Sequence, residues 1–444
     1  MNENLFSIVI LPKFELMKKL FFVAFLACNY CVAQVKCDSS QLPIVFVHGF
    51  MGSGDNWATQ VQRFSSNGFC ENRLFVFDWN SISSRQNTGA LLDSFINEVL
   101  KRTGAGKVNL VGHSAGGGVC YNYLKDSSHV LKVAHYAHLG SMKMKGPAGK
   151  NGEVPTLNIY SKDDKVMTGG GEIAGALNEQ QTGNDHLQVA TSVATFASLY
   201  RFFTGRSEKI NTAILPLKEF YRFMGGKAVV LAENTALAFD SFRVNIIDAK
   251  TGKRYINKNR NTGENYVNWT TFGRDGSFGF NLNKDCYTEF EVHPANGRTL
   301  YYYFEPLLRN NRNVYLRALP TKGMAAAMLG SIPNDDEQTA LVIFTSGNAV
   351  IAGRDTLAID SIPLSLPGLM PANKTSIACF VYDDGDAVTS VKPIKALSVA
   401  PFLTGVDVFI KADEHKTMRV YYNGRSMVLP KRKSKDGIMI VVFN

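Results

Sequence analysis

Residues 108–116 read Val108-Asn109-Leu110-Val111-Gly112-His113-Ser114-Ala115-Gly116. A short apolar run ends at Val111, and apolar residues recur at helical spacing after Gly116, so the segment predicts a strand, a tight turn and a helix. In that context the Gly-x-Ser-x-Gly pattern is typical of a turn that projects a serine hydroxyl at the carboxyl end of a sheet. We interpret Ser114 as a candidate nucleophile. The alternative is a plain glycine-rich turn between a strand and a helix.

A nucleophilic serine needs a base, and His186 is the best-placed candidate. In folds that use this serine turn, the acid and then the histidine follow the serine along the chain. His186 lies in a polar loop before an amphipathic helix whose apolar positions run from Val189 to Phe203. His293 and His415 also follow Ser114, but they lie in a region of different composition and are poorer candidates.

The acid is expected in the turn after the predicted strand 155–160. Two carboxylates compete there, Asp163 and Asp164. We favour Asp164, because Lys165-Val166 follows it and the acid turn commonly has the form Asp-x-apolar. Either aspartate can instead stabilise the turn by bonding to its own backbone.

Together with His48-Gly49-Phe50, which directly follows the predicted strand 44–47, these motifs resemble those of secreted lipases of the α/β-hydrolase superfamily. The motif-level resemblance covers residues 40 to 205. Beyond it, the chain is similar only in general architecture to two-domain archaeal and bacterial lipases, which join a hydrolase domain to a β-rich C-terminal domain. The resemblance implies that the backbone N–H groups of Phe50 and Ala115 form the oxyanion hole. His48 is interpreted as a residue that ties the loop by hydrogen bonds.

One departure from some lipases matters for the acid. They carry it one strand earlier, where this chain reads Leu139-Gly140-Ser141-Met142-Lys143 and has no carboxylate. The acid must therefore come from the turn that holds Asp163 and Asp164.

The chain of 444 residues is long enough for two domains. Over residues 37–206 strand and helix patterns alternate, which predicts an α/β fold with a parallel sheet, the catalytic α/β-hydrolase domain. Residues 207–444 show short β-rich runs separated by turns, which predicts an all-β region, an antiparallel sandwich or barrel. Whether this region forms one unit or two units divided near residue 322 stays open.

Residues 1–33 are expected to form a signal peptide, with Met17 as an alternative start. An apolar run over 20–27 follows two lysines and is too short to span a bilayer. A lipoprotein with Cys28 as the modified residue is a poorer match. The expected location is secreted, periplasmic or at the cell surface.

In the expected fold, the strands 44–47 and 74–77 are parallel neighbours, so their starts lie close together. Cys37 and Cys70 each precede one of these starts, which makes a Cys37–Cys70 disulfide geometrically plausible. Export would make it chemically possible.

The composition narrows the range of partners. Hydrophobic residues make up 45% and charged residues 19% of the chain, which is ordinary for a globular protein, and the formal net charge is +10. A positive charge favours binding to anionic lipid surfaces or polyanions. The sequence has no basic module with interleaved aromatic residues, so it does not indicate nucleic-acid binding. The expected partner is a lipid or another ester, met at an interface. The sequence does not indicate the oligomeric state.

The resemblance implies a serine ester hydrolase, a lipase or carboxylesterase that cleaves acyl glycerols through an acyl-enzyme, with no metal or organic cofactor needed. A polyester depolymerase or an acyl esterase for polysaccharides is the alternative enzyme, because fold and triad do not set the substrate. A surface-binding protein with a vestigial hydrolase domain is the alternative from another class. The connections between 141 and 183 are too short for a large lid, so we expect the C-terminal region to cover the cleft without supplying catalytic groups. Truncation after Arg206 should then spare the hydrolysis of short soluble esters.

Overall fold

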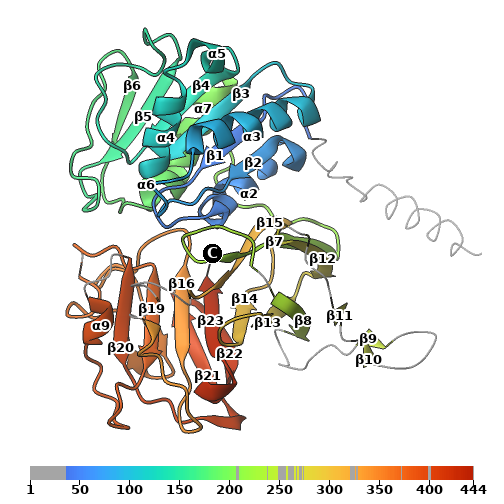
Figure 1. Cartoon of the computed structure of the whole chain (residues 1–444), viewed down its shortest axis with the longest axis vertical. Helices are drawn as coiled ribbons and strands as arrows, with labels where there is room; N and C mark the ends of the chain where they lie inside the picture. The colour runs from blue at the N-terminus through green and yellow to red at the C-terminus, as the bar shows by residue number, and fades with distance from the viewer. Residues whose placement is uncertain are drawn as a thin grey trace, which may run out of the picture.

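The computed structural model describes residues 37–206, 210–237, 239–248, 257–258, 265–266, 268–269, 273, 275–320, 326, 329–371, 373–398 and 402–443. The signal peptide expected over residues 1–33 lies outside these residues. Figure 1 shows an α/β part, coloured blue to green, stacked on a part made almost entirely of strands. Within the described ranges, no helix has the length and apolar character that crossing a membrane requires.

The α/β part is built on a parallel six-stranded sheet in the order β2-β1-β3-β4-β5-β6. Its strands are β1 (Ile44–Val47), β2 (Leu74–Phe77), β3 (Val108–His113), β4 (Val133–Leu139), β5 (Thr156–Ser161) and β6 (Leu177–Gln181). The predicted parallel sheet is thus confirmed. Because parallel strands end at the same edge, the loops after β1, β3 and β5 meet there.

Helices cover both faces of this sheet, as the alternation of its buried residues requires. On β1, Ile44 and Phe46 pack on one face with α2 (Ala58–Ser66) and α7 (Val193–Thr204). Val45 and Val47 pack on the other face with α3 (Thr88–Thr103) and α4 (Ala115–Tyr123). Short helices complete this part: η1 (Gly54–Trp57), η2 (Glu71–Arg73), α5 (Ser127–Val130) and α6 (Gln188–Thr191).

A disulfide joins the segments that precede β1 and β2. Cys37 and Cys70 are bonded, with their Cα atoms 4.8 Å apart. Asp38 forms a parallel bridge with Phe69, just before β1 and β2 begin. Cys120, Cys286 and Cys379 are free and buried.

The C-terminal part is centred on an eight-stranded sheet in the order β11-β8-β13-β14-β23-β16-β19-β20. Its strands are β8 (Phe239–Asp248), β11 (Asn268–Trp269), β13 (Cys286–Pro294), β14 (Leu300–Phe304), β16 (Leu341–Thr345), β19 (Ala378–Tyr382), β20 (Leu403–Asp407) and β23 (Ile438–Phe443). Smaller sheets are β12-β7-β15, β18-β17-β21-β22 and β10-β9. They comprise β7 (Tyr221–Val230), β12 (Ser277–Asn283), β15 (Asn311–Ala318), β17 (Leu357–Ile359), β18 (Ile362–Pro363), β21 (Asp413–Tyr422), β22 (Arg425–Lys431), β9 (Asn257–Lys258) and β10 (Asn265–Tyr266), with the short helices α9 (Lys395–Ser398) and η3 (Ser434–Asp436) between strands.

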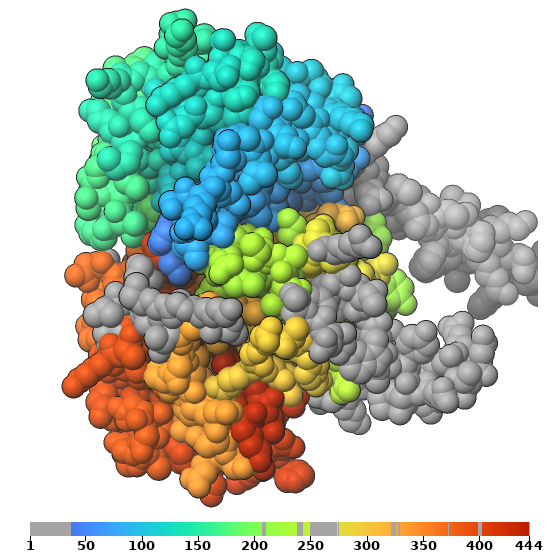
Figure 2. Space-filling view, in the orientation of Figure 1, coloured from blue at the N-terminus to red at the C-terminus, as the bar shows by residue number. Residues whose placement is uncertain are grey.

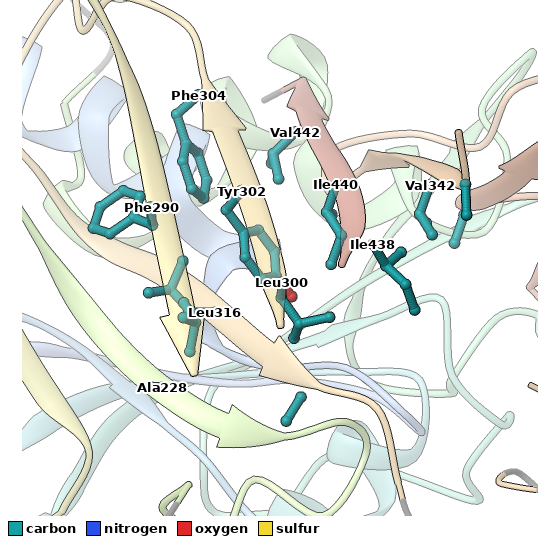
Figure 3. Packing of buried hydrophobic residues seen from close by; sticks show 14 of the residues in the cluster. Ala228, Phe290, Leu300, Tyr302, Phe304, Leu316, Val342, Ile438, Ile440 and Val442 are labelled. Atoms are coloured by element: carbon teal, nitrogen blue, oxygen red, sulfur yellow. The ribbon is translucent and has the colours of Figure 1, made fainter. Parts of the chain in front are cut away.

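Each face of the eight-stranded sheet packs on one of the smaller sheets. Tyr302 and Phe304 of β14 point into a core shared with β7, β12 and β15, part of which Figure 3 shows. Tyr301 and Tyr303 point into a second core shared with β17, β21 and β22. The aromatic run 301–304 is therefore buried on both sides, as expected for alternating residues of a central strand.

The predicted β-rich sandwich is present, but its pairing is not purely antiparallel. β14 and β16 both pair in parallel with β23, β19 pairs in parallel with β20, and β15 pairs in parallel with β7. Such pairs join segments far apart in sequence, which runs of β-rich residues and local turn signals do not reveal. For the same reason the eight-stranded sheet combines strands from before and after residue 322.

The two parts lie directly against one another, as the space-filling view shows (Figure 2). Lys227 and Tyr315, from β7 and β15, both reach the buried carboxylate of Asp78, at 2.7 Å each. Arg317 of β15 forms a buried ion pair with Asp55 of η1. Charged groups on both sides of the contact are thus paired, as burial of charge requires.

Candidate active site

Ser114 stands in a strained turn between β3 and α4. Its φ of 53° and ψ of −125° are rare for a residue with a side chain. Close packing explains the flanking glycines. A Cβ on Gly112 would lie 2.7 Å from the carbonyl oxygen of Gly116, and a Cβ on Gly116 would lie 2.7 Å from that of Val47. Backbone strain held by such packing is characteristic of functional sites.

His186 and Asp164 are brought together by the loops after β6 and β5. His186 Nδ1 lies 2.7 Å from Asp164 Oδ2, and both side chains are almost fully buried. The other oxygen of Asp164 accepts hydrogen bonds from the backbone N–H groups of Val166 and Met167, at 2.9 and 2.8 Å. The carboxylate is thus held in one orientation towards the imidazole.

Asp163, the competing acid, points elsewhere. Its Oδ2 accepts a hydrogen bond from the N–H of Gly183 at 2.6 Å, which ties the turn after β5 to the end of β6. The neighbouring aspartates therefore have different partners, a histidine ring for one and a backbone amide for the other.

The electrostatics of the site favour an ionised Asp164 and a neutral His113 ring. Burial by itself would raise the pKa of Asp164, but the hydrogen bond and charge of His186 and the two backbone N–H groups outweigh it, so its pKa is lowered. Burial and the adjacent His186 lower the pKa of His113 to about 3. His113 Nε2 lies 2.8 Å from the carbonyl oxygen of His186, so a neutral His113 can donate there and fix the loop.

The loop 48–50 lies against the serine, as the predicted oxyanion hole requires. A Cβ on Gly49 would come within 2.9 Å of Ser114 Cβ, so only glycine fits there without a shift. Phe50 lines the same pocket as Ser114 and is 45% exposed, and Ala115 is the first residue of α4. The nitrogens of His48 lie near groups of the loop and its neighbours, including Gly49 O at 2.8 Å and Trp79 N at 3.3 Å, in agreement with a structural role.

An apolar pocket opens at Ser114 and His186, and both parts of the chain line it. The α/β part supplies Gly49, Phe50, Met51, Gly52, Asn56, His113, Ser114, His186 and Leu187. The β-rich part supplies Leu231, Tyr302, Arg317, Leu319, Val342, Phe344, Ile377, Ala378, Phe380, Phe402, Leu403 and Ile440. Most of the apolar lining therefore comes from strands far beyond His186 in sequence.

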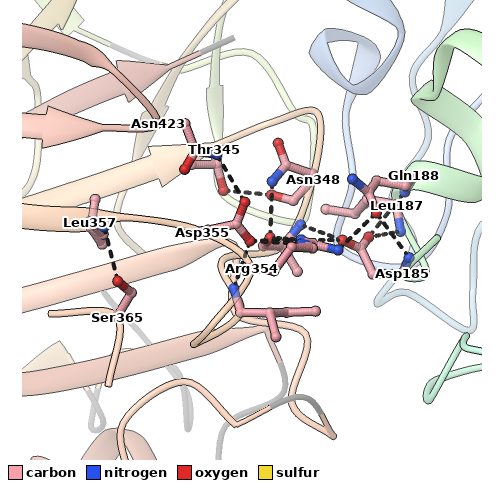
Figure 4. A network of polar contacts seen from close by, with 12 residues as sticks. Asp185, Leu187, Gln188, Thr345, Asn348, Arg354, Asp355, Leu357, Ser365 and Asn423 are labelled. Carbon is pink, nitrogen blue, oxygen red and sulfur yellow. Dashed lines mark hydrogen bonds and ion pairs between the residues drawn. The ribbon is translucent and has the colours of Figure 1, made fainter. Parts of the chain in front are cut away.

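The β-rich part also contacts the loops that carry the site residues. Asp185 Oδ2 forms an ion pair with Arg354 at 2.8 Å, and Asp185 Oδ1 accepts the N–H groups of Leu187 and Gln188. Figure 4 shows this network, which continues from Arg354 to Asp355. Asp185 thus couples the backbone around His186 to the C-terminal sheets.

A second contact of this kind holds the loop after β1. The side-chain amide of Asn234 donates to the carbonyl oxygens of Gly52 and Trp79, at 2.8 and 3.0 Å. The same amide nitrogen lies 3.2 Å from His48 Nε2. The loop that carries Phe50 is therefore fixed in part by a residue of the C-terminal region.

The two poorer candidates for the base, His293 and His415, are not brought to the site. His293 lies on β13 beside Glu291, and His415 lies on β21. Sequence reasoning missed Asn234, Arg354 and the apolar lining of the pocket. No local signal marks them, because pocket-lining and core residues of a strand look alike in sequence.

Within the described part of the chain, one group of acidic residues brings its carboxylates close enough to hold a metal ion. This group lies away from Ser114. They are Asp383, Asp384, Asp386 and Asp407, at the ends of β19 and β20 that are opposite the pocket.

Three family models match successive parts of the chain. Residues 43–149 match the alpha/beta hydrolase fold, residues 222–320 match the lipase C-terminal domain, and residues 329–443 match a model described only as a C-terminal domain. The last two matches fall on either side of residue 322, although one continuous sheet draws strands from both.

Solved structures that are similar to this chain include the mature form of the lipase BlEst2 from Bacillus licheniformis, with 17% identity over 38% of this chain and 94% of that chain and a TM-score of 0.32. Its propeptide form shares 16% identity over 59% of this chain and 71% of that chain, with a TM-score of 0.31. The carboxylesterase CesB from Bacillus subtilis shares 14% identity over 38% and 86%, with a TM-score of 0.30. On the family models and the observed fold, the chain joins a part with the α/β-hydrolase fold to a β-rich region, of which residues 222–320 match the lipase C-terminal domain.

Proposed function

We propose that this protein is a serine ester hydrolase that cleaves long-chain acyl esters, with acyl glycerols as the substrate class. The observation that carries the proposal is the His186–Asp164 pair, 2.7 Å apart, beside Ser114 at the mouth of an apolar pocket. Nucleophile, base and acid follow one another along the chain in the order typical of this fold.

In the first half of the reaction, Ser114 Oγ attacks the ester carbonyl carbon while His186 Nε2 accepts the hydroxyl proton. Asp164, ionised at neutral pH, holds the ring by its Nδ1 and stabilises the imidazolium that forms. The carbonyl oxygen becomes an oxyanion, and the N–H groups of Phe50 and Ala115 are the proposed donors to it. His186 then protonates the leaving alcohol oxygen as the ester bond breaks.

In the second half, water attacks the acyl-enzyme carbonyl and His186 takes the proton from the water. Collapse of the second oxyanion releases the fatty acid and returns the proton to Ser114. Every proton that leaves one oxygen is thus carried to another by the same imidazole.

The substrate class follows from the pocket. Apart from Arg317, the side chains that β15, β16, β19, β20 and β23 present to it are apolar or aromatic, and Arg317 is occupied by Asp55. Each methylene of an acyl chain buried there contributes about 0.8 kcal/mol, so a long chain gains more than a short one. The C-terminal part thereby serves as the acyl-binding wall, and residues 37–206 and 207–444 act as one catalytic unit.

We further propose that the protein is exported and that residues 1–33 serve as its signal peptide. The Cys37–Cys70 disulfide supports this location, because such bonds persist mainly in oxidising compartments.

The test is hydrolysis of p-nitrophenyl esters from acetate to palmitate, followed by an emulsified triglyceride. We expect kcat/KM to rise with chain length, and the triglyceride to release fatty acid. Ser114→Ala should lose activity by at least about 10³-fold and should no longer react with a fluorophosphonate probe. Its circular dichroism and melting temperature control for folding.

Other outcomes separate the alternatives. Release of hydroxy acids from a polyester film, or of acetate from xylan, with no action on triglyceride would identify a different ester class. A folded wild-type protein that is neither labelled nor active on any ester would indicate a vestigial hydrolase domain.

A further inference from the structure

An acidic cluster lies at the end of the C-terminal sheet that faces away from the pocket. Asp383 directly follows β19, and Asp407 ends β20, its parallel neighbour. Asp384 and Asp386 lie in the loop after Asp383, around Gly385, whose φ is +116°. One carboxylate oxygen from each of the four aspartates lies within 4.8 Å of the others.

Asp383 has a buried carboxylate oxygen without a hydrogen-bond partner. The residue is 4% exposed, and its Oδ1 is buried with no hydrogen-bond partner. Its other oxygen accepts the N–H groups of Gly385 and Ala387, at 2.9 and 3.0 Å, so the carboxylate is anchored by one oxygen and leaves the other unsatisfied. A buried carboxylate oxygen without a partner is costly, because it has lost water and gained nothing in return.

Within the described residues, little positive charge reaches this cluster. In the described residues the ion pair that reaches it is that of Lys392 Nζ with Asp407 Oδ2, at 3.8 Å, and Lys392 is 54% exposed. Asp407 is fully buried and also accepts the hydroxyl of Ser390 and, at 3.2 Å, the N–H of Asp384. One exposed ammonium against four carboxylates leaves a net negative charge in a confined space.

The geometry suits a calcium ion. Carboxylate oxygens are hard ligands, which Ca²⁺ binds at about 2.3–2.6 Å with six to eight neighbours. Two oxygens on one such ion can be at most about 5 Å apart, which agrees with the separations in the cluster. Mg²⁺ needs bonds of about 2.0–2.1 Å and a strict octahedron, so it would require the cluster to contract.

We propose that Asp383, Asp384, Asp386 and Asp407 bind a structural Ca²⁺ ion that joins the carboxyl ends of β19 and β20. The unsatisfied Oδ1 of Asp383 becomes a ligand, and the ion offsets the repulsion among the carboxylates. The opposite ends of the same strands, at Ala378 and Leu403, line the apolar pocket. The ion therefore stabilises the acyl-binding wall from its far end and takes no part in the proposed ester hydrolysis.

The test uses the full mature chain, stripped of metal with a chelator and desalted. Calcium is titrated by calorimetry, and terbium is titrated by its luminescence, sensitised by Tyr382 next to Asp383. We expect saturable binding with a Kd below about 1 mM. At 100 times the Kd, the melting temperature should rise by roughly 5 °C, whereas the same concentration of Mg²⁺ should have a much smaller effect.

The variant Asp384→Asn/Asp386→Asn tests the site without disturbing buried groups, because both side chains are exposed. It should lose terbium luminescence and the calcium-dependent rise in melting temperature. Asp336→Asn is the matched control, since Asp336 is an exposed aspartate that pairs with Lys433 and Lys435 and does not belong to the cluster. If the double variant folds poorly, the single variant Asp386→Asn replaces it. The displacement of bound terbium by calcium is then compared between Asp386→Asn and the wild type.

Three results would overturn the proposal. They are the absence of saturable calcium binding up to about 10 mM, unchanged binding in the double variant, and a variant that is more stable than wild type in chelator while calcium stabilises neither. The last result would identify the aspartates as a repulsive surface cluster only. Binding and melting are measured without substrate, so they stand or fall independently of the proposed hydrolase activity.

Discussion

Ser114 shows how a single residue depends on its neighbours' backbones. A non-glycine residue at φ 53° costs on the order of 1–3 kcal/mol, and the turn keeps it because Gly112 and Gly116 let β3, α4 and the end of β1 approach closely. Any side chain at either glycine would meet backbone atoms, which cannot move aside. The strain is therefore stored where the hydroxyl must be presented.

At the same scale, we expect Asp164→Asn to lower kcat by about 10³–10⁴-fold and Asp163→Asn to lower it by less than about 3-fold. Asparagine at 164 would favour the wrong imidazole tautomer and would not stabilise the imidazolium. At 163, an amide oxygen can still accept the N–H of Gly183. Steady-state kinetics on a short soluble ester check both, with melting temperatures as the folding control. A larger loss at Asp163 would reverse the assignment of the acid.

At the scale of elements, the loop before α6 contacts Arg354, which lies in the turn before β17 of the C-terminal part. Arg354→Ala should leave the carboxylate of Asp185, 5% exposed in the wild type, without its cationic partner. We expect a stability loss of about 2 kcal/mol and a fall in kcat, because Asp185 precedes His186 directly. Arg419→Ala, on the exposed face of β21, is the control and should change neither. Urea unfolding and short-ester kinetics are the measurements, and an unchanged kcat would show that the loop is held without Arg354.

Element β20 offers a test of the acyl-binding wall. Leu403 lines the pocket and is only partly buried, so Leu403→Trp should fill pocket space instead of straining a packed core. Displacing about two methylenes costs about 1.6 kcal/mol, so kcat/KM on palmitate esters should fall about tenfold while acetate esters change little. Leu308→Trp, at a residue that is 53% exposed, is the matched control. Equal losses on short and long esters would argue against a chain-binding role for this strand.

At the scale of the whole molecule, the contact between the two parts changes one expectation. Truncation after Arg206 was expected to spare short-ester hydrolysis. The structure shows that residues beyond 206 line most of the pocket and also contact the loops of Phe50 and His186 through Asn234 and Arg354. Removing them would expose Asp55 and Asp78 without their partners. We therefore expect a truncated hydrolase part to lose stability and activity on every ester.

The whole molecule should also lose stability in mild acid. His48, His113 and His138 are buried, and burial is the main cause that lowers each pKa. In the unfolded chain these histidines take up protons below about pH 6.5, whereas in the folded protein they stay neutral to lower pH. Their contribution to the free energy of unfolding is therefore fully present above about pH 6.5, and it is lost as the pH falls towards their pKa values in the folded protein. Each can contribute up to about 1.4 kcal/mol per pH unit. Burial raises the pKa values of Asp185 and Glu305. Protonation of these two carboxylates at lower pH therefore favours the folded state and opposes the effect of the histidines.

Urea unfolding at pH 8, 6.5 and 5 checks this expectation, with tryptophan fluorescence as the readout because Trp57 and Trp79 lie in the α/β part. We expect similar free energies of unfolding at the first two values and a clear decrease at the third. A free energy that stays constant down to pH 5 would mean that the buried histidines are protonated in the folded state.

The α/β part could be inferred largely from local patterns. The strands 44–47, 74–77 and 133–139 have the expected bounds, because apolar runs bordered by glycine and polar turns leave few other possibilities. The order of serine, acid and histidine along the chain follows from the fold itself, so Ser114, Asp164 and His186 could be named as candidates before their distances were known. The pattern of the turn favours Asp164 over Asp163, and Asp164 is the aspartate whose carboxylate lies beside His186 in the structure.

Tertiary structure alone decided how the C-terminal strands pair and what they do. β23 lies between β14 and β16, more than a hundred residues from the first and about a hundred from the second, and no local signal specifies such a partner. The same holds for Asn234 and Arg354, which are ordinary polar residues until folding places them beside His48 and Asp185. Local sequence determines which residues form a strand or a turn, whereas the walls of the pocket arise from contacts between segments that only the packed chain brings together.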